Sequence, residues 1–162
     1  MGRKQYIKQI TAIMEKHKQS LFRYACSRMG NAEDAEDILQ DVYLRMLEKS
    51  GDGKEIDNLE AYIFRTVVNT CNARISPVIQ TDLSGQEVAQ LTEETADLEE
   101  EAQRITRLIG SMPAASREVV RLRIYASLTF DGIASTLNIS TTTAKRRYYE
   151  GLEYLRLKLK AL

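Results

Sequence analysis

The sequence predicts an all-α protein of two small helical domains joined by a flexible acidic linker. Nearly every segment of the 162-residue chain spaces its apolar residues at the helical interval, whereas strand-like alternation is weak. The stretch from Pro77 to about Glu101 is polar, acidic and poor in large apolar side chains, which is typical of a tether. We therefore expect helical domains at 1–76 and 104–162 and a linker at 77–103, partly helical toward its end.

Charge is unevenly distributed along a chain whose formal net charge is zero. Residues 75–103 carry eight Asp or Glu and no Lys or Arg, a net charge of −8. Residues 104–162 carry eleven Lys or Arg against four Asp or Glu, a net charge of +7. A strongly basic C-terminal third therefore follows an acidic connector, and such a third suits a polyanionic partner.

Several classes of protein are disfavoured by what the sequence lacks. No apolar run is long enough to span a bilayer and the N-terminus has no signal-peptide segment, so we expect a cytoplasmic protein without membrane insertion. Cys26 and Cys71 have no CxxC spacing and His17 is the sole histidine, which favours buried thiols over a metal site. Phosphate-loop, Ser/His/Asp and HExxH patterns are missing, so we expect no catalytic residues, no metal, no cofactor and no enzymatic activity.

The N-terminal helices are delimited by local signals. We expect helices at about 5–29, broken near Lys18, at 32–49 and at 58–74. Asn31 is the expected N-cap of the helix at 32–49, and Asn58 that of the helix at 58–74. SGDG at 50–53 is a flexible stop after the first of these helices, and Ser76-Pro77 ends the second. Further helices are expected in part of 86–111 and at 114–126, 129–137 and 141–160.

The helix expected at 32–49 has one apolar and one acidic face. The predicted buried stripe consists of Ala35, Ile38, Leu39, Val42 and Met46. The outer face consists of Glu33, Asp37, Gln40 and Asp41. Periodicity alone leaves two interpretations equally open: an ordinary solvated surface, or a docking surface for a basic protein.

The helix expected at 58–74 opposes a broad apolar side with a polar face. The apolar side consists of Leu59, Ile63, Phe64, Val67, Val68 and Cys71, and the polar face of Tyr62, Arg65, Asn69 and Asn72. One aromatic, one cation and two amides offer stacking, phosphate contact and base-edge hydrogen bonds, as a single-strand reader requires. The alternative is that Tyr62 only lies at the edge of the core.

The C-terminal segment has helix-turn-helix spacing around the sequence STTTAKRRYY at 140–149. Thr129 caps the first helix, Leu137-Asn138-Ile139 forms the turn, and Ser140 caps the second helix. The predicted buried side of the second helix consists of Ala144, Tyr148, Leu152, Leu155 and Leu159. The opposite side and its flanks present Thr142, Thr143, Lys145, Arg146, Arg147 and Tyr149. A solvated face is the alternative, but the caps, the turn and the +7 charge favour duplex DNA, with Arg146 on a base and Lys145 on phosphate.

Two long motifs resemble a known family. GNAEDAEDILQDVYLRMLE followed by NLEAYIFRTVVNTCNAR is similar to region 2 of an extracytoplasmic function (ECF) sigma factor of the sigma-70 family. SMPAASREVVRLRIYASLTFDGIASTLNISTTTAKRRYYEGLEYLRLKL resembles region 4. Both motifs lie in the family's order and at its spacing. Departures include Tyr62 where Trp is usual, Gly132 in place of the Glu of EIA, Met112 in place of the Leu of LP, and Glu150 at an often basic position.

The resemblance implies roles for matched residues. Asp37 and Gln40 fall on the AEDxxQ motif and would face the clamp helices of the largest polymerase subunit. Tyr62, Asn69 and their neighbours would capture the −10 strand together with the preceding loop. Lys145, Arg146, Arg147 and Tyr149 would contact the −35 element.

The function that the resemblance implies is that of a DNA-binding transcription initiation factor without a catalytic site of its own. Its expected partners are core RNA polymerase, promoter DNA and an anti-sigma factor, which in this family is often membrane-anchored. Two rival interpretations remain: a two-domain regulator that binds operator duplex without polymerase, and a helical adaptor with no DNA role.

Overall fold

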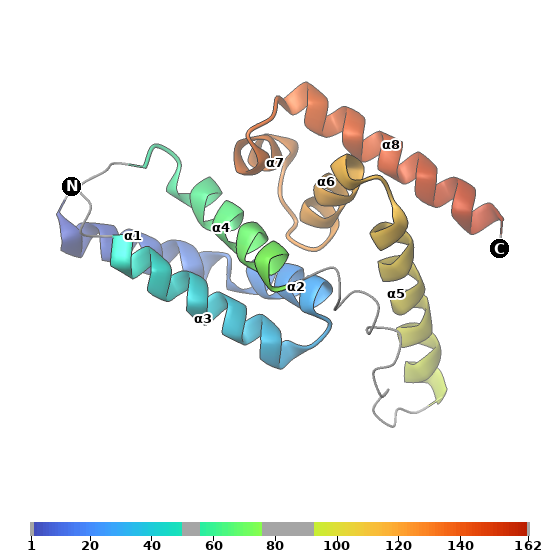
Figure 1. Cartoon of the computed structure of the whole chain (residues 1–162), viewed down its shortest axis with the longest axis horizontal. Helices are drawn as coiled ribbons and strands as arrows, with labels where there is room; N and C mark the ends of the chain where they lie inside the picture. The colour runs from blue at the N-terminus through green and yellow to red at the C-terminus, as the bar shows by residue number, and fades with distance from the viewer. Residues whose placement is uncertain (1, 50–55, 76–92, 162) are drawn as a thin grey trace.

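The computed structural model describes residues 2–49, 56–75 and 93–161, and these residues are almost entirely helical (Figure 1). The N-terminal unit contains α1 (Arg3–Lys16), α2 (Lys18–Met29), α3 (Ala32–Glu48) and α4 (Leu59–Arg74). The C-terminal unit contains α5 (Glu93–Ser111), α6 (Ala114–Ile124), α7 (Phe130–Leu137) and α8 (Thr141–Lys160). No strand occurs in the three described ranges, which confirms the predicted all-α class.

The four helices with an expected N-cap, α3, α4, α7 and α8, begin where the sequence predicts. Each expected cap oxygen accepts a hydrogen bond from the backbone N–H three residues ahead, at 2.8 Å for Asn31, 3.1 Å for Asn58, 3.0 Å for Thr129 and 3.1 Å for Ser140. These bonds satisfy N–H groups that have no partner within the helix. Between α7 and α8, Asn138 adopts the left-handed conformation with φ of 56°, which closes the tight turn.

The first expected helix is broken as predicted, because His17 separates α1 from α2. By contrast, α6 ends at Ile124, two residues before the expected end. Helix α5 begins at Glu93, within the stretch expected to be the linker. Residues 76–92 of that stretch, and residues 50–55 of the expected loop, lie outside the described part of the chain.

The core of the N-terminal unit lies where α2, α3 and α4 pack together, with α1 against α3. Its fully buried side chains are Ile10, Leu21, Tyr24, Ile38, Val42, Met46, Ile63, Phe64 and Val67. Burying a large apolar side chain contributes about 1.5–3 kcal/mol each. Of the stripes predicted for α3 and α4, only Leu39 and Leu59 are half-buried rather than buried.

The C-terminal unit packs α6 and α7 against α8. At the crossing of α6 and α8, a Cβ on Gly151 would lie 2.6 Å from Cγ2 of Val120, so only glycine permits this approach. Of the side of α8 predicted to be buried, only Ala144 is fully buried. Tyr148, Leu152 and Leu155 are half-buried, and the burial predicted for Leu159 is wrong, because this residue is 48% exposed. Leu155 packs against the apolar cluster of the unit, and Leu159 lies one turn further along α8.

The two units contact each other through α4 and α7, which lie side by side (Figure 1). Buried residues of both units belong to one apolar cluster, among them Val67 and Cys71 of α4 and Ile133 of α7. Nη2 of Arg23 also donates to Oγ of Ser127, 3.3 Å away. The surface of α4 that faces α7 is therefore an interface within the chain.

Candidate functional site

The acidic face predicted on α3 is present. Glu33, Asp37 and Gln40 are exposed, and Asp41 is half-buried. The apolar stripe of α3 packs against α2 and α4 and thereby turns this face outward. The carboxylates of Glu33 and Asp34 lie in the first turn, where they complement the positive end of the helix dipole.

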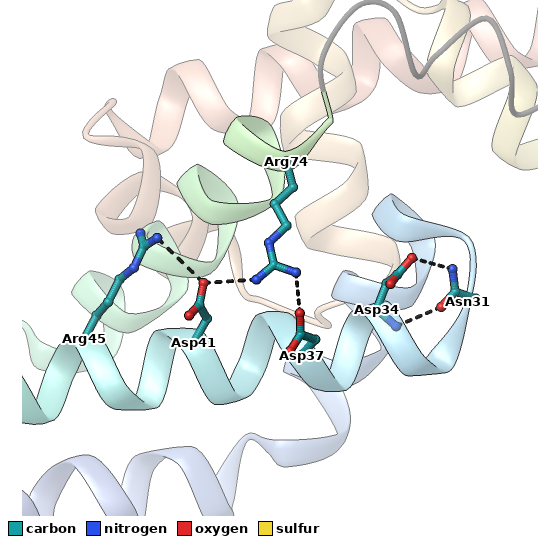
Figure 2. A network of polar contacts seen from close by, with 6 residues as sticks. All are labelled: Asn31, Asp34, Asp37, Asp41, Arg45 and Arg74. Carbon is teal, nitrogen blue, oxygen red and sulfur yellow. Dashed lines mark hydrogen bonds and ion pairs between the residues drawn. The ribbon is translucent and has the colours of Figure 1, made fainter.

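Two carboxylates of this face are joined to the end of α4 (Figure 2). Nη1 of Arg74 lies 2.6 Å from Oδ2 of Asp37, and its Nη2 lies 3.1 Å from Oδ2 of Asp41. Arg45, one turn after Asp41, approaches the same oxygen at 3.7 Å. The hydrogen bond to Asp37 raises the pKa of Arg74, which therefore stays charged. Periodicity within α3 could not reveal Arg74, because it comes from another helix.

The polar face predicted on α4 forms one side of a pocket. Tyr62, Arg65 and Asn69 line an open pocket of about 510 Å³ between α3 and α4. Arg45 of α3 and Lys49, which follows α3, also line the pocket, together with Met46, Glu48, Thr66 and Thr70. Sequence reasoning missed these two cations, since only the packing of the two helices places them beside Tyr62.

Tyr62 and Lys49 form the centre of this pocket. Nζ of Lys49 lies 4.7 Å from the centroid of the Tyr62 ring and also donates to the tyrosine hydroxyl. The hydroxyl is thereby held, whereas the ring is half-buried rather than part of the closed core. An aromatic ring bordered by cations and by the exposed amide of Asn69 can hold a base and its phosphate.

Arg65 is engaged by the C-terminal unit. Its Nε donates to the carbonyl oxygen of Thr136, 2.8 Å away, and its Nη2 donates to that of Ser135, 3.0 Å away. Both carbonyls belong to the last turn of α7, whose oxygens have no partner within the helix and carry the negative end of its dipole. The open position expected for Arg65 is therefore not observed in this arrangement of the two units.

The basic face predicted on α8 is largely exposed. The side chains of Thr142, Lys145, Arg146 and Tyr149 are exposed, whereas Thr143 and Arg147 are half-buried. The hydroxyl oxygen of Thr143 lies 2.8 Å from Oγ of Ser140 and so belongs to the N-cap. Arg146 approaches only Glu150, at 3.9 Å, and both side chains are more than 60% exposed.

A second aromatic group supports the start of this helix. The rings of Phe130 and Tyr148 meet edge to face with centroids 5.3 Å apart, and Tyr148 meets Tyr149 in the same way at 5.5 Å. Tyr149 is still 61% exposed. Ala144 is fully buried beneath the basic face. The first two turns of α8 are thus fixed to the unit while Lys145 and Arg146 remain exposed to solvent, as a helix that enters a major groove requires.

Comparison with known families identifies both units. The Sigma-70 region 2 family model matches residues 13–76, and the Sigma-70, region 4 model matches residues 102–155. The chain is a sigma factor of the sigma-70 family. The two matched regions contain the acidic face, the α3–α4 pocket and the basic face of α8.

Named relatives place this sigma factor in the ECF class. It is 28% identical over 158 residues to the ECF RNA polymerase sigma factor SigL of Mycobacterium tuberculosis, a match that covers 93% of this chain and 89% of SigL. It is 22% identical over 150 residues to the RNA polymerase sigma factor SigV of Bacillus subtilis, covering 93% of this chain and 90% of SigV. Both relatives are named as RNA polymerase sigma factors.

A solved structure shows the same fold. CnrH in complex with the cytosolic domain of CnrY matches this sigma factor with a TM-score of 0.68 and 18% identity, over 98% of this chain and 95% of that chain. A match over nearly the whole chain means that both units correspond.

The last residue predicted on the polar face of α4, Asn72, lies outside the lining of the pocket. It is exposed, and its Oδ1 accepts a hydrogen bond of 2.7 Å from Nη2 of Arg28 on α2. The side chain of Arg28 is only 6% exposed, and its Nη1 lies 2.9 Å from the hydroxyl of Tyr24. In this sigma factor, Tyr62, Arg65 and Asn69 of the predicted polar face therefore line the pocket, whereas Asn72 is bound to the buried Arg28.

The two cysteines differ in their burial. Cys26 and Cys71 are both free, but Cys26 is only half-buried, which corrects the expectation that both are buried. Burial raises the pKa of the Cys71 thiol to about 11. Within the described ranges no group of His, Cys, Asp or Glu could hold a metal ion. None of the described helices is long and apolar enough to cross a membrane.

Proposed function

We propose that this ECF sigma factor assembles with core RNA polymerase in the cytoplasm and recognises both promoter elements through three separate surfaces. The observation that carries the proposal is the α3–α4 pocket, where a tyrosine ring, cations and an amide meet. A protein that binds only duplex operators has no use for such a pocket, because stacking on Tyr62 needs an unpaired base.

The first surface, the acidic face of α3, docks the polymerase clamp through Glu33, Asp37, Gln40 and Asp41. Its carboxylates complement a basic partner surface, which steers association and fixes orientation. The sigma factor needs no catalytic residues in this scheme, since the polymerase performs nucleotidyl transfer.

The second surface binds the −10 element once its base pairs open. Tyr62 stacks on a base, Arg65 neutralises phosphate, and Asn69 and Asn72 form hydrogen bonds to base edges. Lys49 and Arg45 add cations at the rim of the pocket. Arg65 reaches the strand only after it leaves the carbonyl oxygens of Ser135 and Thr136, so strand capture requires α4 and α7 to separate.

The third surface reads the −35 element as duplex. Arg146 is the base-reading residue, while Thr142, Thr143, Lys145, Arg147 and Tyr149 position the helix on phosphates and along the groove. The pairing of Arg146 with Glu150 is exposed at 3.9 Å and is therefore easily exchanged for a guanine edge.

An anti-sigma factor is the further partner we propose. The matched CnrH structure is a complex with the cytosolic domain of CnrY, so a protein of this fold is bound by part of a larger protein. A membrane-anchored inhibitor with a cytosolic arm would fit that arrangement.

Reconstituted transcription tests the proposal. Purified core polymerase, with or without this chain, is used to select promoters from a random DNA library, and the selected fragments are then transcribed. We expect run-off product only when the chain is present. Operator-like binding by the chain alone, without any transcript, would instead identify a duplex-binding regulator.

A further inference from the structure

The hydrogen bond between Arg28 and Asn72 fixes the orientation of an exposed amide. Nη2 of Arg28 lies 2.7 Å from Oδ1 of Asn72 and Nη1 lies 2.9 Å from the Tyr24 hydroxyl. A guanidinium group has donors only, so the carbonyl end of the amide must face Arg28. The amide of Asn72, on an exposed residue, is then left to turn its two N–H donors away from Arg28.

The cation that fixes this amide is itself held firmly. The Arg28 side chain is 6% exposed while the two units are in contact, and the Tyr24 ring of its own unit lies 5.9 Å away. The carboxylate of Glu118, at 3.9 Å, belongs to α6 of the C-terminal unit and is not needed for the contacts to Tyr24 and Asn72. Burial raises the pKa of the Tyr24 phenol, so this hydroxyl remains protonated beside Arg28. Rotation of the Asn72 amide would turn its NH₂ group toward a guanidinium that has only donors, so the rotation is unfavourable whether or not the units are in contact.

We propose that Arg28 is a positioning residue that makes Asn72 a hydrogen-bond donor toward the opened promoter strand, and that this donor selects bases with an acceptor on the exposed edge. The inference rests on the proposed function, in which α4 contacts the −10 element. The acceptors concerned are the exocyclic keto oxygens, O4 of thymine and O6 of guanine, because adenine and cytosine carry an amino donor at the equivalent position. Asn69, three residues earlier on α4, has no such constraint among its described contacts and serves as the comparison.

An alternative interpretation is that Asn72 only completes the hydrogen bonding of Arg28. The two interpretations differ in the effect of Asn72→Asp. An aspartate keeps, and strengthens, the bond to the buried guanidinium, so the fold is retained. Its outer oxygen, however, accepts rather than donates, so the base preference should change from acceptor-bearing to donor-bearing edges only if Asn72 reads the strand.

The decisive experiment measures open-complex formation by the polymerase reconstituted with full-length chain. The templates carry each of the four bases in turn at every position of the non-template −10 strand, within a premelted bubble. For wild type we expect one position that favours an acceptor-bearing base by about 5- to 10-fold, the effect of one hydrogen bond. Asn72→Asp should reverse that preference, and Asn72→Ala should flatten it.

Arg28→Lys tests the positioning role directly. Lysine keeps the charge but cannot fork between Tyr24 and Asn72, so the preference at that position should fall to about 2-fold or less, while total binding to a scrambled premelted strand is unchanged. Adding Arg28→Lys to Asn72→Ala should cause no further loss of base preference. Adding Arg28→Lys to Asn69→Ala should multiply the two losses. If Arg28→Lys does not fold, as judged by circular dichroism, the Asn72→Asp result decides alone.

The possible failures are distinguishable. If the Asn72 variants keep the wild-type base preference while Tyr62→Ala impairs opening, the role of Arg28 and Asn72 is refuted and the −10 assignment of α4 stands. If Tyr62→Ala and Asn69→Ala are also without effect, the proposed use of α4 fails as a whole.

Discussion

Nη1 of Arg74 lies 2.6 Å from Oδ2 of Asp37, which ties the last residue of α4 to the outer face of α3. The Asp37 side chain is 62% exposed, so the ion pair adds at most about 1 kcal/mol to the free energy of unfolding. The ion pair instead fixes the position of α4, which is proposed to read the −10 strand, relative to the outer face of α3, which is proposed to dock polymerase.

Replacing Asp37 and Gln40 together with Ala should weaken binding to core polymerase by about 1.5–3 kcal/mol, the usual loss for a charge-assisted contact. Helix content should not change, because both side chains are exposed. Fluorescence titration of labelled chain with core enzyme measures the effect. Glu36→Ala, which removes another exposed acid from α3, is the matched control. Wild-type affinity in the double variant would refute the assignment.

Arg146→Ala should reduce discrimination between the cognate −35 duplex and a scrambled one by about 1–3 kcal/mol if Arg146 reads a base. Lys145→Ala should weaken both duplexes alike and lower the slope of log affinity against log salt by about one. Arg156→Ala removes an exposed arginine further along α8, and we expect it to leave discrimination unchanged. Equal losses on the two duplexes in Arg146→Ala would make Arg146 a phosphate contact.

Tyr62→Ala should slow open-complex formation rather than initial promoter binding, through a loss of stacking of about 1–3 kcal/mol. Tyr62→Phe keeps the ring and loses only the hydroxyl that Lys49 binds, so its opening rate should stay near wild type. Permanganate footprinting should show weaker thymine reactivity around −10 in the alanine variant, partly restored by a premelted bubble. Wild-type reactivity on linear duplex would leave Tyr62 as a tyrosine at the edge of the core.

Arg65→Ala should loosen the contact between α4 and α7, because it removes both hydrogen bonds to the α7 carbonyl oxygens. Small-angle scattering of the free protein should show a larger radius of gyration, whereas Arg107→Ala, an exposed change on α5, should show none. An unchanged radius for Arg65→Ala would mean that the shared apolar cluster alone holds the units together.

Raising the pH should destabilise the protein through Cys71. Burial raises the pKa of this thiol to about 11 from an ordinary value near 9.0, so the unfolded chain loses the proton first. The free energy of unfolding should therefore fall between pH 9 and 11, by at most about 3 kcal/mol, and be unaffected below pH 9. Urea titrations at pH 8, 9 and 10 should show a shallower decline for Cys71→Ala than for wild type. Tyr24, whose pKa burial also raises, adds to the decline above pH 10.

The parts of the structure that could be predicted from the sequence are those that depend on neighbours along the chain. The N-caps at Asn31, Asn58, Thr129 and Ser140 act over three residues, so their pattern is visible in the sequence. Helical periodicity likewise identified the outer face of α3. It misplaced Leu159 because it indicates which side a residue faces, and not whether anything packs against that side.

The contacts that shape the candidate sites join segments far apart in the sequence. Arg74 reaches Asp37 across 37 positions, and Arg65 reaches the carbonyl oxygen of Thr136 across 71. Such pairs follow from how the helices pack, which no local pattern encodes. The role of Arg28 was hidden for the same reason, since its partner Asn72 lies on another helix.

The hydrogen bonds from Arg65 to the last turn of α7 also impose an order on assembly. A strand that binds only chains with separated units has its affinity reduced by the fraction of chains in that state. Were that fraction about 1%, the free protein would bind a −10 strand about 100-fold more weakly than its contacts allow. A polymerase that holds the units apart would raise the affinity for the −10 strand by the same factor. The fold would thus reserve opened −10 strands for the assembled enzyme, while the unassembled protein would bind such strands only weakly.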